Sequence, residues 1–179
     1  MTPQSVDNPK SAVSISQWFI QNNLDSPANT NEGNTKLQKL LFFAWLIHYH
    51  EHETPLFDDD FYAFPNGPVV ETVRQEYKFR YQSLKEQALP EYTNDELTTF
   101  TLVKDIFGDS DAEELIEISH NSPAWSKYNT ESIQERLGCS DSQRPKIPRS
   151  APKSDLKKEL KMIRNVLFVH RNPNHLFSF

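Results

Sequence analysis

The fold of this chain is decided between residues 37 and 70, where LQKLLFFAWLIH (residues 37–48) is followed, after a polar stretch, by FYAFPNGPVV (residues 61–70). Drawn as a helix, the first segment is apolar on nearly every side, which is typical of a buried helix. Thr35 carries a hydroxyl suited to helix capping, and Gln38 stands at the reciprocal position of a capping box. We therefore predict a central helix that begins at Thr35 and around which other helices pack.

The residues after this helix favour a short two-stranded or extended β element. Asp58–Asp60 separates two short apolar runs, and Pro65, which has no N–H to donate to a neighbouring strand, ends the second run. Gly67 supplies a backbone geometry that other residues resist. Pro68 suits the first position of a helix, so we predict that the next helix begins there and buries one side.

Apolar residues at helical spacing predict further helices on both sides of this centre. They cover Ser11–Leu24, Asn94–Phe107, Ala112–His120 and a basic C-terminal helix, Lys153–Val169. The predicted fold class is mainly α, a compact helical domain around a buried central helix. The expected organisation is a disordered N-terminus (1–10), the helical domain (11–137), a linker rich in Pro, Ser and Arg (138–153), and a basic helix with an apolar tail (154–179).

Charge is distributed unevenly along the 179 residues, whose formal net charge is −6. Residues 1–143 carry a net charge of −13, whereas residues 144–179 carry +7. One interpretation is a solvated acidic surface followed by an amphipathic basic helix. The other is two binding surfaces of opposite sign, of which the acidic one would attract a basic partner and speed its encounter.

Composition also limits the class of protein. The longest apolar run, residues 40–47, is too short to span a membrane, and the polar N-terminus lacks the apolar segment of a signal peptide. The single cysteine, Cys139, excludes an intrachain disulfide and any cysteine-rich metal site. We expect a cytoplasmic protein without a membrane partner.

Three groups of residues could suggest catalysis or metal binding, but each lacks the residue pattern that such a site requires. His48 and His52 share a helix face, but His50 points away from them and the HExxH pattern of zinc enzymes is absent. Ser119 and His120 are adjacent on a helix and do not face each other, so we interpret them as a polar clamp onto the Pro123–Trp125 segment. Three consecutive acids at 58–60 lack the ligand spacing of a calcium loop. We expect no metal, no cofactor and no enzyme activity.

The order of these motifs resembles the Panacea domain, the family that includes SocA-like antitoxins and phage-associated GepA-type proteins. The resemblance covers roughly Ser11 to Tyr128. Ser119 stands where family members often have Thr, and Phe64 stands where Trp is frequent. The motif positions, expected to support the shape of the domain, are Leu37, Lys39, Leu40, Gly67, Pro68, Val69, Ser119, His120 and Trp125.

The resemblance implies a mostly helical, bacterial antitoxin that neutralises a toxin encoded beside it by direct binding. An alternative within the family is a proteolytic adaptor that delivers the toxin to a AAA+ protease. A metal-dependent hydrolase built on the histidine cluster is a third, more distant alternative. Nucleic acid is not expected as a partner, except through the basic C-terminal segment.

The residues expected to contact a partner are charged or apolar side chains outside the predicted core. The terminal Leu176-Phe177-Ser-Phe179 either packs back on the domain or inserts into a partner. The candidate contacts are Asp58, Asp59, Asp60, Glu113, Glu114, Glu117, Lys157, Lys161, Arg164, Phe177 and Phe179.

Overall fold

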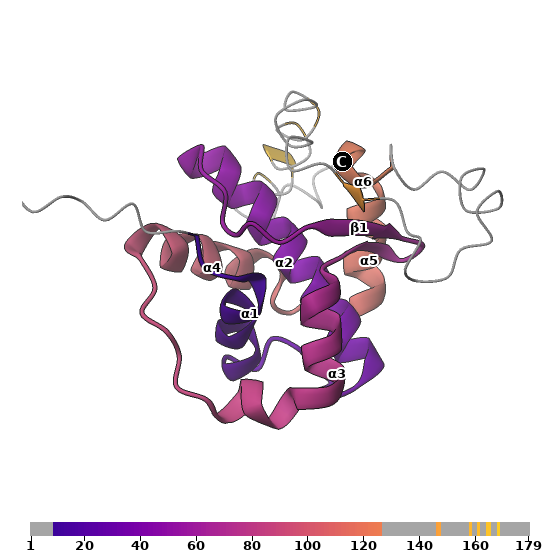
Figure 1. Cartoon of the computed structure of the whole chain (residues 1–179). Helices are drawn as coiled ribbons and strands as arrows, with labels where there is room; N and C mark the ends of the chain where they lie inside the picture. The colour runs from indigo at the N-terminus through magenta and orange to yellow at the C-terminus, as the bar shows by residue number, and fades with distance from the viewer. Residues whose placement is uncertain are drawn as a thin grey trace, which may run out of the picture.

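The computed structural model describes residues 9–126 and 146–147, together with residues 158, 161, 164–165 and 168. This part of the chain is mainly helical, as predicted, with a small antiparallel sheet (Figure 1). The helices are α1 (Ala12–Gln21), α2 (Asn31–His52), α3 (Glu71–Glu86), α4 (Asn94–Phe107), α5 (Ala112–His120) and α6 (Pro123–Ser126). The strands are β1 (Phe61–Phe64), β2 (Gly67–Val69) and β3 (Lys146–Ile147).

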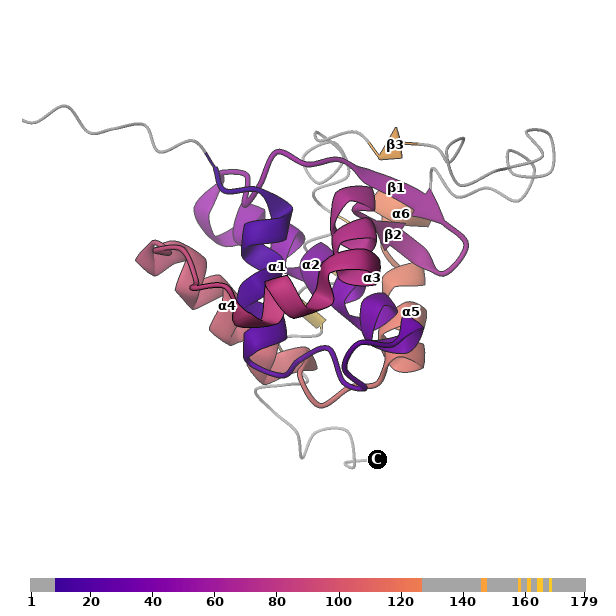
Figure 2. The same ribbon diagram turned by 60° about the horizontal axis from the view of Figure 1, so that its bottom comes forward.

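Helix α2 forms the centre of the fold, which confirms the predicted buried central helix. It contacts α1, α3, α4, α5 and strand β2, and it passes between them in both views (Figures 1 and 2). Every residue from 36 to 48 is buried. Aromatic packing ties its neighbours to it, since the rings of Phe43 on α2 and Phe107 on α4 stack with centroids 4.3 Å apart.

The start of α2 differs from the prediction. The helix begins at Asn31, and the Thr30 hydroxyl accepts a hydrogen bond from Gly33 N at 3.0 Å, so Thr30 is the cap in place of Thr35. Thr35 lies inside the helix and donates to Asn31 O. The first turn of α2 consists of polar residues and a glycine, which are weak helix signals. Gly33 is required there because a Cβ would lie 2.3 Å from the Pro27 carbonyl oxygen.

The Gly67–Pro68 segment is also not the start of a helix. It forms β2, which pairs with β1 in the register Tyr62↔Val69 and Phe64↔Gly67. Helix α3 begins only at Glu71, after Val70 at its N-cap position. The hairpin is closed by Gly67, whose φ of +109° is rarely adopted by residues with a side chain.

A third strand lies within the segment predicted to be a linker. Strand β3 lies beside β1 (Figure 2) and pairs with its other edge, with Phe61 opposite Ile147. Ile147 is buried. The sheet order is β2-β1-β3, so β1 is the central strand. The remainder of residues 138–153 lies outside the described residues, as does most of the predicted helix 153–169, whose described residues are helical and exposed.

The later helices match their predicted bounds. Helix α4 begins at a full capping box in which Thr93 and Glu96 satisfy each other's backbone N–H groups, and it ends at Gly108. Helix α5 begins after Asp111, whose carboxylate accepts from Glu114 N at 2.8 Å. No helix among the described residues is long and apolar enough to cross a membrane.

Candidate functional site

The end of α5 holds the turn of the β1–β2 hairpin. The His120 ring lies 3.1 Å, through Nε2, from Pro65 O, and because a carbonyl only accepts, Nε2 carries the proton. Trp125 Nε1 donates to Phe64 O at 2.9 Å. The two rings stack on each other with centroids 4.1 Å apart and an interplanar angle of 10°. The joint between α5 and α6 is therefore also the support of the hairpin turn.

Three motif residues from three elements meet behind this turn. A Cβ on Gly67 would lie 2.7 Å from Lys39 Cε and 2.7 Å from Ser119 Oγ, so the side chains of Lys39 on α2 and Ser119 on α5 fill the space beside Gly67 of β2. Ser119 Oγ donates to Ile116 O within its own helix and takes no part in the stacking of His120 on Trp125. The motif positions thus surround one structural junction.

Lys39 occupies an unusual place in this junction. It is 1% exposed, and its Nζ donates to Pro68 O at 3.1 Å. Among the described residues no carboxylate forms an ion pair with it. Burial away from water disfavours the ammonium and lowers the pKa of Lys39 from 10.5 to about 7.

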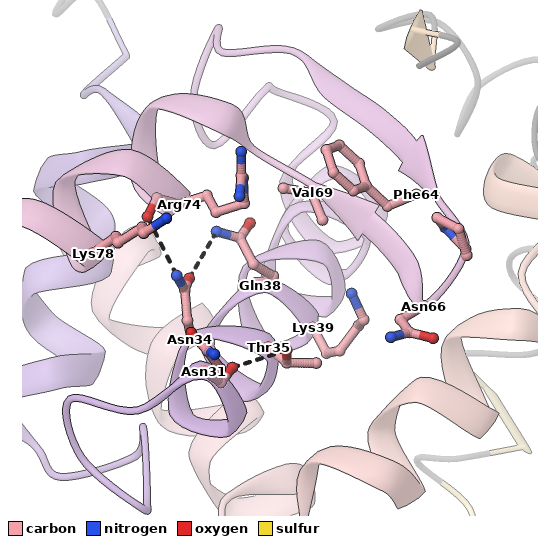
Figure 3. A pocket seen from close by; sticks show the side chains of 11 residues that line it. Asn31, Asn34, Thr35, Gln38, Lys39, Phe64, Asn66, Val69, Arg74 and Lys78 are labelled. Carbon is pink, nitrogen blue, oxygen red and sulfur yellow. Dashed lines mark hydrogen bonds between the residues drawn. The ribbon is translucent and has the colours of Figure 1, made fainter. Parts of the chain in front are cut away.

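Lys39 also lines a pocket of about 320 Å³ between α2, the hairpin and α3 (Figure 3). The pocket wall combines cations, side-chain amides and a few apolar groups, and none of the described residues that line it is acidic. The lining residues are Asn31, Asn34, Thr35, Gln38, Lys39, Phe64, Pro65, Asn66, Val69, Arg74 and Lys78. The Nε and Nη2 atoms of Arg74 each donate a hydrogen bond of 2.8 Å to the Glu71 carboxylate. The Arg74 guanidinium also lies over the Phe64 ring.

Two amides of α2 fix the wall that α3 contributes. Val70 N donates to Gln38 Oε1 at 2.8 Å, and Gln38 Nε2 donates to Val70 O at 3.4 Å. One turn earlier, Asn34 Nδ2 donates to Arg74 O at 3.2 Å (Figure 3). These bonds set the position of α3 relative to α2, and with it the position of Arg74 and Lys78.

The acidic turn expected to face a partner is largely engaged within the chain. Asp58 is exposed, but Asp59 is half-buried and accepts from Ala12 N at 2.8 Å and from the Thr72 hydroxyl at 3.1 Å. Asp60 is half-buried as well and pairs with Lys146 at 3.2 Å. The expectation that all three acids are exposed is therefore wrong for Asp59 and Asp60, because one caps α1 and the other holds β3.

The remaining candidate contacts are distributed between α5 and the C-terminal segment. Glu113, Glu114 and Glu117 are exposed on α5. Lys161 and Arg164 are exposed, whereas Lys157, Phe177 and Phe179 lie outside the described residues. The sequence analysis did not identify Arg74 and Lys78 as site residues. Their i, i+4 spacing places both cations on one face of a helix, and this pattern could have indicated them.

The histidine cluster separates into a buried and a half-buried ring. His48 is buried, and its Nδ1 lies 2.8 Å from the Thr99 hydroxyl oxygen. The Nδ1 of His52 lies 3.6 Å from a carboxylate oxygen of Asp95. The ring centroids of His48 and His52 are 4.7 Å apart. In the part of the chain that the structure describes, no three His, Cys, Asp or Glu side chains are arranged to hold a metal ion. Burial, and then the charge of His52, lower the pKa of His48 to about 4.

His48 should make the fold sensitive to mild acid. The unfolded chain protonates His48 near its ordinary pKa of 6.5, whereas the folded chain does so only near pH 4. Between these values the unfolded state binds more protons, so stability falls as the pH falls, by about 1.4 kcal/mol per unit at most. His48→Gln removes this titration. We expect urea unfolding of the wild type to lose stability relative to His48→Gln between pH 6.5 and 4.5, and parallel curves would contradict this.

Lys39 should likewise make the folded state more stable as the pH rises, here in the alkaline range. The unfolded chain binds the Lys39 proton below about pH 10.5, and the folded chain binds it only below about pH 7. Stability therefore rises with pH across this interval, by about 1.4 kcal/mol per unit at most. Lys39→Met replaces the side chain by an unbranched apolar one that is one atom shorter and cannot titrate. The difference in unfolding free energy between wild type and Lys39→Met should grow in favour of the wild type from pH 7.5 to 9.5, and a constant difference would refute the account.

Comparison with protein families identifies a match for this chain. The family described as "Antitoxin SocA-like, Panacea domain" matches residues 37–126, half of the chain. This range contains the central helix from Leu37 onward, the hairpin, the pocket residues from Gln38 to Lys78, and the joint formed by His120 and Trp125. The pocket residues Asn31, Asn34 and Thr35 precede it. No curated protein and no solved structure matches the chain.

Proposed function

The chain belongs to the SocA-like Panacea domain family of antitoxins, and on this basis we propose that it neutralises a toxin protein by binding it directly. The family match carries the proposal. In this proposal the chain acts as a binding protein and not as an enzyme. Its helical body covers the active site or substrate channel of the toxin. The bracing of the hairpin by α5 and α6 supports the proposal, because a surface that is ordered before binding loses less entropy on association.

The charge of the described body favours a basic partner. Residues 9–126 contain eight Lys and Arg against nineteen Asp and Glu, a net charge of −11. On α5, Glu113 and Glu117 lie one turn apart with Glu114 beside them, and all three are exposed. We propose that this acidic face of α5 steers the encounter with a basic toxin.

The first test is growth of cells that express the neighbouring reading frame, alone and together with this chain. The proposal expects growth arrest from the neighbour alone and relief of the arrest on co-expression. Relief must be lost when the chain carries an early stop codon, which separates the action of the protein from that of its messenger RNA. No arrest from either adjacent frame would contradict the proposal.

Neutralising the α5 face should slow the encounter. With Glu113, Glu114 and Glu117 all changed to Gln, we expect the association rate with the toxin to fall about tenfold at low salt and its dependence on salt to weaken. A matched control changes three exposed acids elsewhere, Glu51, Glu53 and Glu91, to Gln, with the same loss of charge. Stopped-flow association measures both variants. Equal rates for the two would show that only the total charge matters and would remove α5 from the interface.

A further inference from the structure

The pocket beside Lys39 contains a buried amine for which the described part of the chain supplies no carboxylate. An ammonium has three N–H groups to donate, and among the described residues Lys39 gives one, to Pro68 O. We propose that this pocket binds a carboxylate group presented by the toxin, with Lys39 at its inner wall and Lys78 at its mouth. This inference rests on the proposed function and specifies a second, oppositely charged contact of the same interface.

The first step of the argument is that Lys39 lacks a counter-charge. Removing an ammonium from water without a partner is costly, and buried charges in proteins are normally paired. An anion in the pocket would supply the missing charge and the missing acceptor together. Burial lowers the pKa of Lys39 to about 7, and an anion in the pocket would stabilise the charged ammonium form.

The second step is that the pocket is built to recognise a small planar anion. The side-chain amides of Asn31, Asn34 and Asn66 line it and include N–H groups that suit carboxylate oxygens. Val69 and Phe64 give it an apolar side for the methylene groups of an acidic side chain. Asn31, Asn66 and Lys78 are exposed, so the mouth opens at the surface of the molecule.

The third step identifies a protein as the source of the anion. The net charge of −11 over residues 9–126 repels a polyanion such as nucleic acid at long range. Arg74 is already bound by Glu71, which leaves Lys39 and Lys78 as the cations that face the ligand. A single carboxylate on an otherwise basic protein meets both conditions: the acidic body attracts the protein, and the pocket receives its one acidic group.

The test has an arm with the toxin and an arm without it. In the first arm, the dissociation constant for the toxin is measured for wild type, Lys39→Met, Lys78→Gln and the control Lys104→Gln, an exposed lysine on α4. We expect at least tenfold weaker binding for the two pocket variants and less than a twofold change for the control. Lys78 is exposed, so its variant folds even if Lys39→Met does not.

In the second arm, sodium acetate and inorganic phosphate are titrated into the free chain while the side-chain amide signals of Asn34, Gln38 and Asn66 are followed by NMR. The proposal expects saturable shifts with acetate at these amides, and their loss in Lys78→Gln. Stronger binding of phosphate than of acetate would overturn the carboxylate assignment. Unchanged amides with both anions would overturn the pocket itself.

The two arms separate the pocket from the antitoxin function. If the wild type binds no toxin but acetate still shifts the pocket amides, the proposed function fails, and with it the assignment of the carboxylate to a toxin. If the toxin binds wild type and both pocket variants equally, the function stands and the carboxylate contact is wrong.

Discussion

Gly67→Ala is expected to destabilise the protein by about 3 kcal/mol or more, because strain and overpacking each cost about 1–3 kcal/mol at such a position. The strain arises because Gly67 has a φ of +109°, which an alanine rarely adopts. The overpacking arises because the new methyl group would lie 2.7 Å from Lys39 Cε and from Ser119 Oγ. Urea unfolding at pH 7.5 measures the loss.

Two further variants accompany this test: the first is a control in the same turn, and the second tests the contribution of overpacking. Asn66→Ala alters the exposed neighbour in the same turn and should change stability by less than about 0.5 kcal/mol, as surface substitutions usually do. Ser119→Ala removes one of the two atoms that the methyl group would meet, so the double variant should recover part of the loss. A loss below 1 kcal/mol in Gly67→Ala would show that the hairpin is not packed against α2 and α5 as described.

Trp125→Ala should cost about 3–5 kcal/mol, the range for removing a large aromatic side chain from a packed site. The indole is buried, stacks on the His120 ring, and donates its only N–H to Phe64 O. Its removal frees the turn of the hairpin from α6 and leaves a cavity behind it. Since natural domains are stable by about 5–15 kcal/mol, we expect a large drop in melting temperature and in soluble yield.

Trp125→Phe is the matched variant for this prediction. It keeps an aromatic ring against His120 but cannot donate to Phe64 O, so it should lose about 1–2 kcal/mol, the cost of one lost hydrogen bond with slightly poorer packing. Thermal unfolding followed by circular dichroism ranks the two variants. An equal loss for Phe and Ala would mean that the hydrogen bond, and not the packing of the ring, holds the joint.

The sequence predicts the elements whose signals are local. Helix α4 has its capping box and its terminal glycine within one continuous stretch, and α5 follows directly after Asp111, so their bounds agree with the prediction. The central helix was predicted from its apolar surface, which is buried over residues 36–48. These features depend on neighbouring residues alone.

The errors arise where distant residues decide the local structure. Pro68 fits a helix start by itself, but pairing of β2 with β1 extends it into a strand. Lys146 and Ile147 form a strand because Phe61 and Tyr62 are opposite them, more than eighty residues away. Asp59 was expected at the surface, and the N-terminus of α1 makes it a capping residue instead.

The pocket also depends on residues that are distant in the sequence, so the sequence analysis did not predict it. Its residues come from α2, the hairpin and α3, and the single apolar stretch around Lys39 does not indicate that a hairpin closes over it. The available sequence signal is a polar stripe, Asn31, Asn34 and Gln38, on the first half of a helix that is otherwise apolar. Such a stripe predicts that something polar faces it, and here that is the backbone at Val70 and Arg74.

The most direct test of the central claim is a titration of the purified toxin with this chain, in which complex formation and toxin activity are followed in the same samples. We expect the activity to fall in proportion to the complex and to vanish when the toxin is saturated. Activity that persists in the saturated complex, or growth rescue without any complex, would contradict neutralisation by direct binding.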